Sequence, residues 1–231
     1  MKKKIVYFFA LLSLVIFVGA CGAKKTDPKD AATAFLNAEF YGKDTEQYEK
    51  IFNQKLPDTT TSIKDGLNVS LGQFGLSDEI LSDTAKNLQK AIADETSFTI
   101  KEVTDKKKSQ EVNVEIYGLD FSKIIDTIQE KGEAELVKLL NNDGVKVEKI
   151  EDLEKITDPD ILEKANKLIS NPDTNKKLME AIIPNMFKDA KKVEKPKTVK
   201  FTLEPGEKKS EWKISNYDKT VMDITQAMLV Q

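Results

Sequence analysis

Apolar residues recur every three or four positions in the first part of the chain, which predicts a series of amphipathic helices. The first helix begins at Pro28, directly after an aspartate, and ends at Gly42. The second begins at Asp44, which together with Gln47 has the spacing of a capping pair, and it ends before Pro57. The helical spacing indicates that each helix buries one side against a common core.

The helical period is then lost and regained. Residues 57–77 contain a run of threonines and three glycines, which indicates an irregular connection. Ser77 has the character of an N-cap, and the apolar residues from Leu81 to Ile92 after it share one helix face. We therefore expect one long connection followed by a third helix.

Alternation of apolar and polar residues predicts two β-hairpins. The first has a polar loop at 105–110, and its inward side chains are Phe98, Ile100, Val112, Val114 and Ile116. The second turns at Pro205–Gly206, and its inward side chains are Val199, Phe201, Leu203, Trp212 and Ile214. Each hairpin supplies two strands to an antiparallel sheet.

Residues from about 120 to 196, between the hairpins, predict a helical insertion. Asp158–Pro159 and Asn171–Pro172 each open a helix, and Pro184 is expected to kink or end the last one. A closing helix follows the second hairpin at residues 221–229.

These elements predict an α+β fold. An antiparallel sheet of about four strands packs with the N-terminal helices, the helical insertion and the C-terminal helix. We expect a single domain over residues 28–231, with the insertion at about 120–196.

Residues 1–20 have the three parts of an export signal. Lysines at positions 2–4 precede an apolar stretch that ends at Val18, and two small residues follow it. The apolar stretch is shorter than the roughly 18 to 20 residues that cross a bilayer as a helix. A permanent membrane helix containing Cys21 is the alternative, and it fits this length less well.

Val18-Gly19-Ala20-Cys21 resembles the lipobox of bacterial lipoproteins. The resemblance implies that the Cys21 sulfur receives a diacylglyceryl group and that the signal peptide is cleaved between Ala20 and Cys21. Residues 21–27 would then form a membrane-proximal tether, which reaches at most about 25 Å when extended. The implied location is the extracellular face of the cell membrane, with lipid anchoring.

The composition argues against several classes of function. All 36 basic residues are lysine, 39 residues are acidic, and histidine is absent, so the formal net charge is −3. A nucleic-acid partner is not expected, because such binding needs a concentrated basic face. Without histidine, and with its one cysteine committed to lipid, the chain is not expected to bind a metal or cofactor or to be an enzyme. A hydrolase that uses only carboxylates, such as Asp126 and Glu130, remains the minor alternative.

The two ends of the domain resemble exported lipoproteins of Gram-positive bacteria (Firmicutes) with a nuclear-transport-factor-2-like or cystatin-like domain. The resemblance lies in Asp30–Leu36, Tyr41–Asp44, Val199–Leu203 and Glu211–Ile214. It implies a cone in which helices close over a curved sheet, sometimes leaving an apolar pocket. The residues that would line such a pocket are Phe98, Ile100, Val114, Ile116, Phe201 and Trp212. Packing in a solid core is the more common role for such residues.

Two hypotheses of function follow. The first is a non-enzymatic envelope lipoprotein that binds a protein, a peptide or a wall component near the membrane. The alternative is a carrier that holds an apolar small molecule between sheet and helices. A third role, signalling by the released peptide Leu14–Ala20, has nothing in its composition to favour it. The oligomeric state is not predicted.

Overall fold

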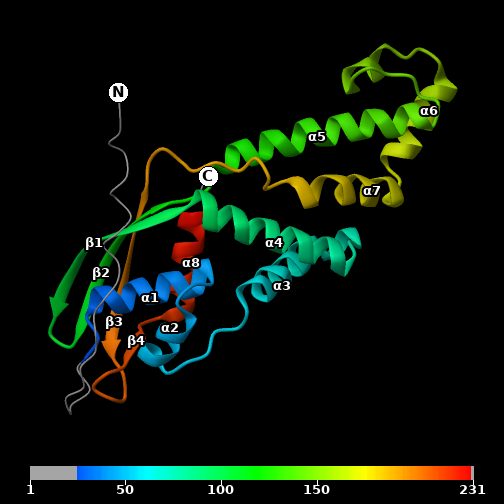
Figure 1. The fold of residues 1–231 in the computed structure, drawn as a ribbon. Coiled ribbons are helices and arrows are strands. Elements are labelled where there is room, and N and C mark those ends of the chain that lie inside the picture. The colour runs from blue at the N-terminus through cyan, green and yellow to red at the C-terminus, as the bar shows by residue number, and fades with distance from the viewer. Residues whose placement is uncertain (1–24, 230–231) are drawn as a thin grey trace, which may run out of the picture.

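The structure is a computed structural model that describes residues 25–229 (Figure 1). Its helices are α1 (Pro28–Tyr41), α2 (Thr45–Phe52), α3 (Thr59–Leu71), α4 (Asp78–Glu95), α5 (Phe121–Asn142), α6 (Pro159–Ile169), α7 (Pro172–Ile182) and α8 (Tyr217–Met228). Short 3₁₀ helices are η1 (Gly72–Phe74), η2 (Ile150–Lys155) and η3 (Ile183–Asn185). The strands are β1 (Ser97–Lys106), β2 (Ser109–Tyr117), β3 (Lys197–Pro205) and β4 (Trp212–Ile214). The fold is α+β, as predicted.

The four strands form one antiparallel sheet in the order β1-β2-β3-β4. Both predicted hairpins are present, and the insertion connects the neighbouring strands β2 and β3. Val112 pairs with Phe201 across these two strands. The first hairpin loop is shorter than predicted, because Asp105 pairs with Gln110 in the ladder and only residues 107–108 turn.

Helices α1 and α8 cover one face of the sheet (Figure 1). Phe35 of α1 packs on Phe201 of β3, with ring centroids 5.5 Å apart. The inward side chains of β2 and β3 are buried in this main core. This burial follows from the alternation seen in the sequence, since every second strand residue points to the same side.

The first two helices begin and end close to where the sequence predicts. The carboxylate of Asp27 accepts the backbone N–H of Lys29, and Gly42 ends α1 in the left-handed region at φ +62°. Asp44 occupies the N-cap position of α2, as predicted, but its side chain makes no capping hydrogen bond. Its carboxylate instead accepts a hydrogen bond from Asn37 Nδ2 at 2.7 Å.

The prediction of an irregular connection at 57–77 is also wrong, because most of it forms α3. The carboxylate of Asp58 caps this helix by accepting the backbone N–H of Thr61 at 2.8 Å. Ile63 packs against the main core, and α3 lies along α4 (Figure 1). Packing against α4 therefore outweighs the weak helix propensity of threonine and glycine.

Residues 121–190, which we call the arm, contain α5, α6 and α7 and extend away from the sheet (Figure 1). Pro184 ends α7 as predicted, and the chain continues as η3. The chain leaves and re-enters the sheet at one place, because the N–H of Val193 donates to the carbonyl of Gly118 at 2.9 Å. Near its tip the arm has a second, separate apolar core, formed by Leu140, Val145, Val147 and Ala165.

Candidate functional site

A pocket of about 290 Å³ lies between α1, α3, α4 and α8. Its wall is mainly apolar, with contributions from Phe40, Leu56, Pro57, Ile63, Leu88, Ile92, Val221, Met228 and Leu229. Its polar lining residues are Glu39, Thr59, Ser62 and Thr225. The volume is near the lower end of the range for small-molecule sites, so the pocket suits a small apolar group.

Glu39 is the one carboxylate in this wall. It is half-buried on α1, and its Oε2 accepts a hydrogen bond from the Tyr217 hydroxyl at 2.6 Å. Burial raises the pKa of Glu39 above the usual value of a glutamate, and the Tyr217 hydrogen bond partly opposes this rise. None of the ion pairs within residues 25–229 involves Glu39.

The charge of Glu39 also affects the pKa values of two tyrosines, Tyr48 and Tyr217. Burial raises the pKa of the Tyr48 phenol to about 12, and the negative charge of Glu39 adds to this effect. The pKa of Tyr217 is raised by burial, by its hydrogen bond to Glu39 and by the charge of that group. Both phenols therefore remain neutral near pH 7, and Tyr217 acts as a hydrogen-bond donor to Glu39.

The six sheet residues considered as a pocket lining do not line this pocket. They lie instead in the main core or against it, and they are Phe98, Ile100, Val114, Ile116, Phe201 and Trp212. Phe98 packs on Tyr41 of α1, with ring centroids 5.8 Å apart. Because α1 lies directly on the sheet, its side chains fill the space that a sheet-lined pocket would need.

Sequence reasoning missed the pocket because its lining combines α1, α3 and α4 from the first part of the chain with α8 from the last. One of them, α3, lies in the segment predicted to be irregular. Glu39 itself gave a usable signal, because it stands between the buried residues Ala38 and Phe40. A charged residue in so apolar a run is uncommon unless it has a partner or a function.

The other residues considered for chemistry lie apart from this pocket. Asp126 and Glu130 are exposed on α5, and neither lines the pocket between α1, α3, α4 and α8. Within residues 25–229, no three acidic, histidine or cysteine side chains are grouped in a way that could hold a metal ion. In the same range, no helix is both long and apolar enough to cross a membrane.

Trp212 is buried in the main core, and it also holds the start of the described chain. Its indole Nε1 donates a hydrogen bond to the carbonyl oxygen of Thr26 at 2.9 Å. The Lys25 ammonium lies 3.7 Å from the centroid of the same ring, a cation–π contact. Ala20 and Cys21, the expected cleavage and lipidation residues, lie outside the described residues.

Residues 18–165 match the model of a protein family described as a domain of unknown function, DUF5105. The chain belongs to this family. The matched range ends within α6, so β3, β4 and α8 of this DUF5105 protein lie beyond it.

The fold of the DUF5105 protein is similar to a crystal structure of a "putative lipoprotein (ycdA)" from Bacillus subtilis. The TM-score is 0.58 and the sequence identity is 17%, over 87% of this chain and 56% of the other. The chain thus spans little more than half the length of that structure, and at this identity the similarity is evidence for the fold alone. A comparison with curated proteins yields no match.

These matches support only one part of the resemblance that was inferred from the sequence. They support membership of a family without an assigned function, and neither names a nuclear-transport-factor-2-like or cystatin-like fold. That part of the resemblance, and the origin in a Gram-positive bacterium, stay predictions.

Proposed function

We propose that this DUF5105 protein is a lipoprotein of the cell envelope and that its domain is a binding module rather than an enzyme. In this proposal Cys21 carries the lipid and the domain lies at the extracellular face of the membrane. The lipobox resemblance at Val18–Cys21 supports the anchor. The Bacillus subtilis protein of similar fold is named a "putative lipoprotein", which agrees with such an anchor.

The binding site in this proposal is the pocket between α1, α3, α4 and α8. The observation that carries it is the half-buried Glu39 carboxylate in an apolar wall, without a lysine partner among the described residues. An ionised group removed from water without a counter-charge is costly. A ligand that brings a positive charge or a hydrogen-bond donor to Glu39, together with a small apolar body, offsets this cost.

An amine attached to a small apolar group has this chemistry. It is either a free small molecule, as for a carrier, or an apolar residue beside an amino group on a peptide or wall component. The recognising chemistry is the same in both cases. The size of the pocket favours a short apolar group over a long acyl chain.

The proposal is tested with three probes of equal chain length and different charge: hexylamine, hexanol and hexanoate. We expect the lipidated protein in neutral nanodiscs to bind hexylamine most tightly and hexanoate least, measured by isothermal titration calorimetry against empty nanodiscs. Glu39→Gln keeps an acceptor for Tyr217 but removes the charge. We expect it to weaken hexylamine binding by roughly 10- to 100-fold, because hydrogen bonds to charged groups contribute roughly 1.5 to 3 kcal/mol.

The pH dependence has a definite sign. Because the pKa of Glu39 is raised, the carboxylate is protonated at a higher pH than an ordinary glutamate, and the preference for hexylamine is lost as the pH falls through that value. The Glu39→Gln protein should show no such loss.

Two tryptophan variants of α3 distinguish the pocket from the surface. Ile63→Trp fills the pocket and should reduce binding of all three probes, whereas Val69→Trp adds the same side chain at a position that is 87% exposed. Saturable binding that is equal in both variants would place the probes elsewhere and contradict the assignment. A peptide with an N-terminal apolar residue, added as a fourth ligand, distinguishes the two sources. Binding tighter than that of hexylamine favours a peptide or wall component, and weaker binding favours a free small molecule.

A further inference from the structure

Two hairpin turns and the start of the described chain lie at one end of the sheet. In an antiparallel sheet of order β1-β2-β3-β4, the turns after β1 and after β3 fall at the same end. These are the turns at residues 107–108 and 206–211. Lys25 lies beside the second turn, in a shallow depression that it shares with residues 205–209. We call these two turns together with Lys25 the turn end (Figure 1).

Trp212 fixes the chain to this end. It is the first residue of β4, is buried, and binds the backbone of Thr26 through its indole N–H. The ammonium group of Lys25 lies over the Trp212 ring, and the carboxylate of Asp27, two residues later, caps α1. The polypeptide is therefore held against the domain from residue 25 onward, three residues before residue 28, where the expected tether of 21–27 would give way to the domain.

The distance from the anchor to the domain is correspondingly short. Only four residue steps separate Cys21 from Lys25, and a fully extended chain covers at most about 3.6 Å per residue, or roughly 14 Å. A domain attached so closely brings the end that carries Lys25 to the lipid headgroups. The turn end is that end.

The charges exposed there suit an anionic surface. Three acids of this region have lysine partners, in the pairs Glu111–Lys106 at 3.8 Å, Glu207–Lys213 at 3.4 Å and Glu211–Lys208 at 2.8 Å. Asp105 accepts a hydrogen bond from Gln110, Asp27 caps α1 by accepting the N–H of Lys29, and Glu204 is exposed. Four further exposed lysines are outside every ion pair within residues 25–229, namely Lys25, Lys107, Lys108 and Lys209.

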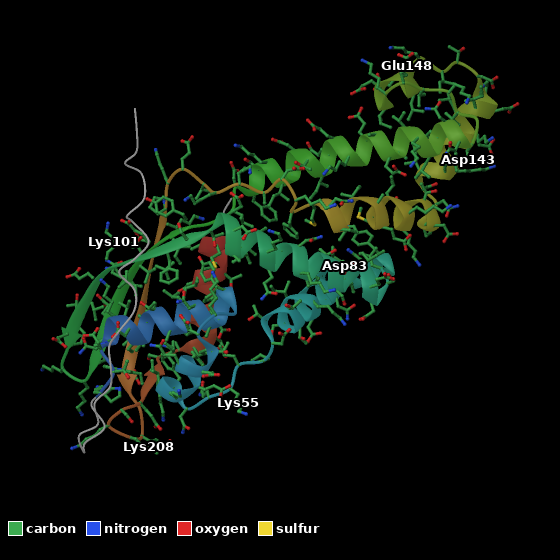
Figure 2. The ribbon with its side chains drawn as sticks, in the orientation of Figure 1. Lys55, Asp83, Lys101, Asp143, Glu148 and Lys208 are labelled. Atoms are coloured by element: carbon green, nitrogen blue, oxygen red, sulfur yellow. The ribbon has the colours of Figure 1, made fainter. Side chains whose placement is uncertain are left out.

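We infer that the turn end is a docking surface for an anionic lipid bilayer, and that the arm consequently extends away from the membrane. The inference rests on the proposed anchor at Cys21 and adds the orientation of the domain. Ammonium groups interact with anionic headgroups only within about a Debye length, roughly 8 Å at physiological salt. The four-step connection is short enough to let the lysines of the turn end come within that range. Figure 2 shows Lys208 near this end, and Asp143 and Glu148 at the distant tip of the arm.

The orientation is measurable because lipidation consumes the one native thiol. In the lipidated protein, a cysteine introduced as Ser109→Cys at the turn end or as Asp143→Cys at the arm tip is the single free thiol and accepts a donor dye. Each protein is reconstituted into vesicles of phosphatidylcholine, with or without phosphatidylglycerol, that carry an acceptor on the headgroup. We expect strong energy transfer from position 109 and weak transfer from position 143, and phosphatidylglycerol should increase the difference.

A triple variant tests the lysines against a matched control. Lys107→Gln, Lys108→Gln and Lys209→Gln together should lower transfer from position 109 toward the value at position 143. The control replaces three exposed arm lysines outside every ion pair in residues 25–229, as Lys149→Gln, Lys164→Gln and Lys177→Gln, and should leave both transfers unchanged.

The outcomes separate this inference from the proposal beneath it. Equal transfer from positions 109 and 143, equal effects of the two triple variants, or no effect of phosphatidylglycerol overturns the docking surface while the anchor stands. Failure of the protein to float with neutral vesicles contradicts the anchor itself, and the orientation with it.

Discussion

Gly118 is the residue at which the sheet, the arm and the last helix meet. A Cβ atom at this position would lie 2.3 Å from the carbonyl oxygen of Ala227 and 2.5 Å from that of Met228. The next residue, Leu119, donates its N–H to Met228 at 2.6 Å. The absence of a side chain at position 118 therefore allows the end of α8 to pack directly on the chain that leaves β2.

We predict that Gly118→Ala lowers the free energy of unfolding by about 1 to 3 kcal/mol, as overpacking against backbone atoms typically does. The control is Gly66→Ala in the middle of α3, where a Cβ would meet no atom within 4 Å. That change should raise stability by up to about 1 kcal/mol, because alanine is the better helix former. Urea unfolding measures both. A neutral Gly118→Ala would contradict the close approach of α8.

Among the elements, the arm has a core of its own. The apolar cluster at its tip, centred on Leu140, is separate from the core between sheet and helices. At its base, the arm is joined to α4 by a hydrogen bond from Asn87 Nδ2 to the carbonyl of Pro184 at 2.8 Å. Lys131 and Asp189 form an ion pair within the arm. The tip therefore depends mainly on its own buried side chains.

Replacement of the fully buried Leu140 should loosen the arm tip without unfolding the sheet. We predict that Leu140→Ala, a change that typically costs about 2 to 5 kcal/mol in a core, removes hydrogen-exchange protection from residues 136–169. Protection in β2 and β3 should stay the same. Ile125→Ala on the same helix is the control, because Ile125 is 45% exposed. Equal loss of protection in the sheet would mean that tip and sheet unfold as one unit.

The elements that the sequence predicts well are those with a strong local signal. The alternation at 112–116 predicts β2, and the Asp-Pro and Asn-Pro pairs at 158–159 and 171–172 predict the starts of α6 and α7. Helix α3 is missed because its threonines and glycines have low helix propensity, and the packing against α4 that stabilises it is not visible locally. The pocket is missed for the same reason, since it depends on how four distant helices pack.

At the scale of the whole molecule, the start of the described chain is held by Trp212, and a pocket containing Glu39 lies between the helices. The proposed lipid anchor at Cys21 precedes that held segment by four residues. The sequence suggested the anchor and the inward strand residues, and the structure places those strand residues in the core. The docking of Thr26 on Trp212 joins residues 186 positions apart, so no local pattern could have indicated it.

The proposed anchor at Cys21 is tested most directly by the mass of the mature N-terminal peptide, isolated from membranes of cells that express the full chain. We expect a peptide that begins at Cys21 and carries a diacylglyceryl group on its sulfur. Cys21→Ser should abolish both the cleavage after Ala20 and the added mass. An unmodified cysteine in the membrane-bound protein, or a mature chain that begins at another residue, would contradict the anchor and the orientation inferred from it.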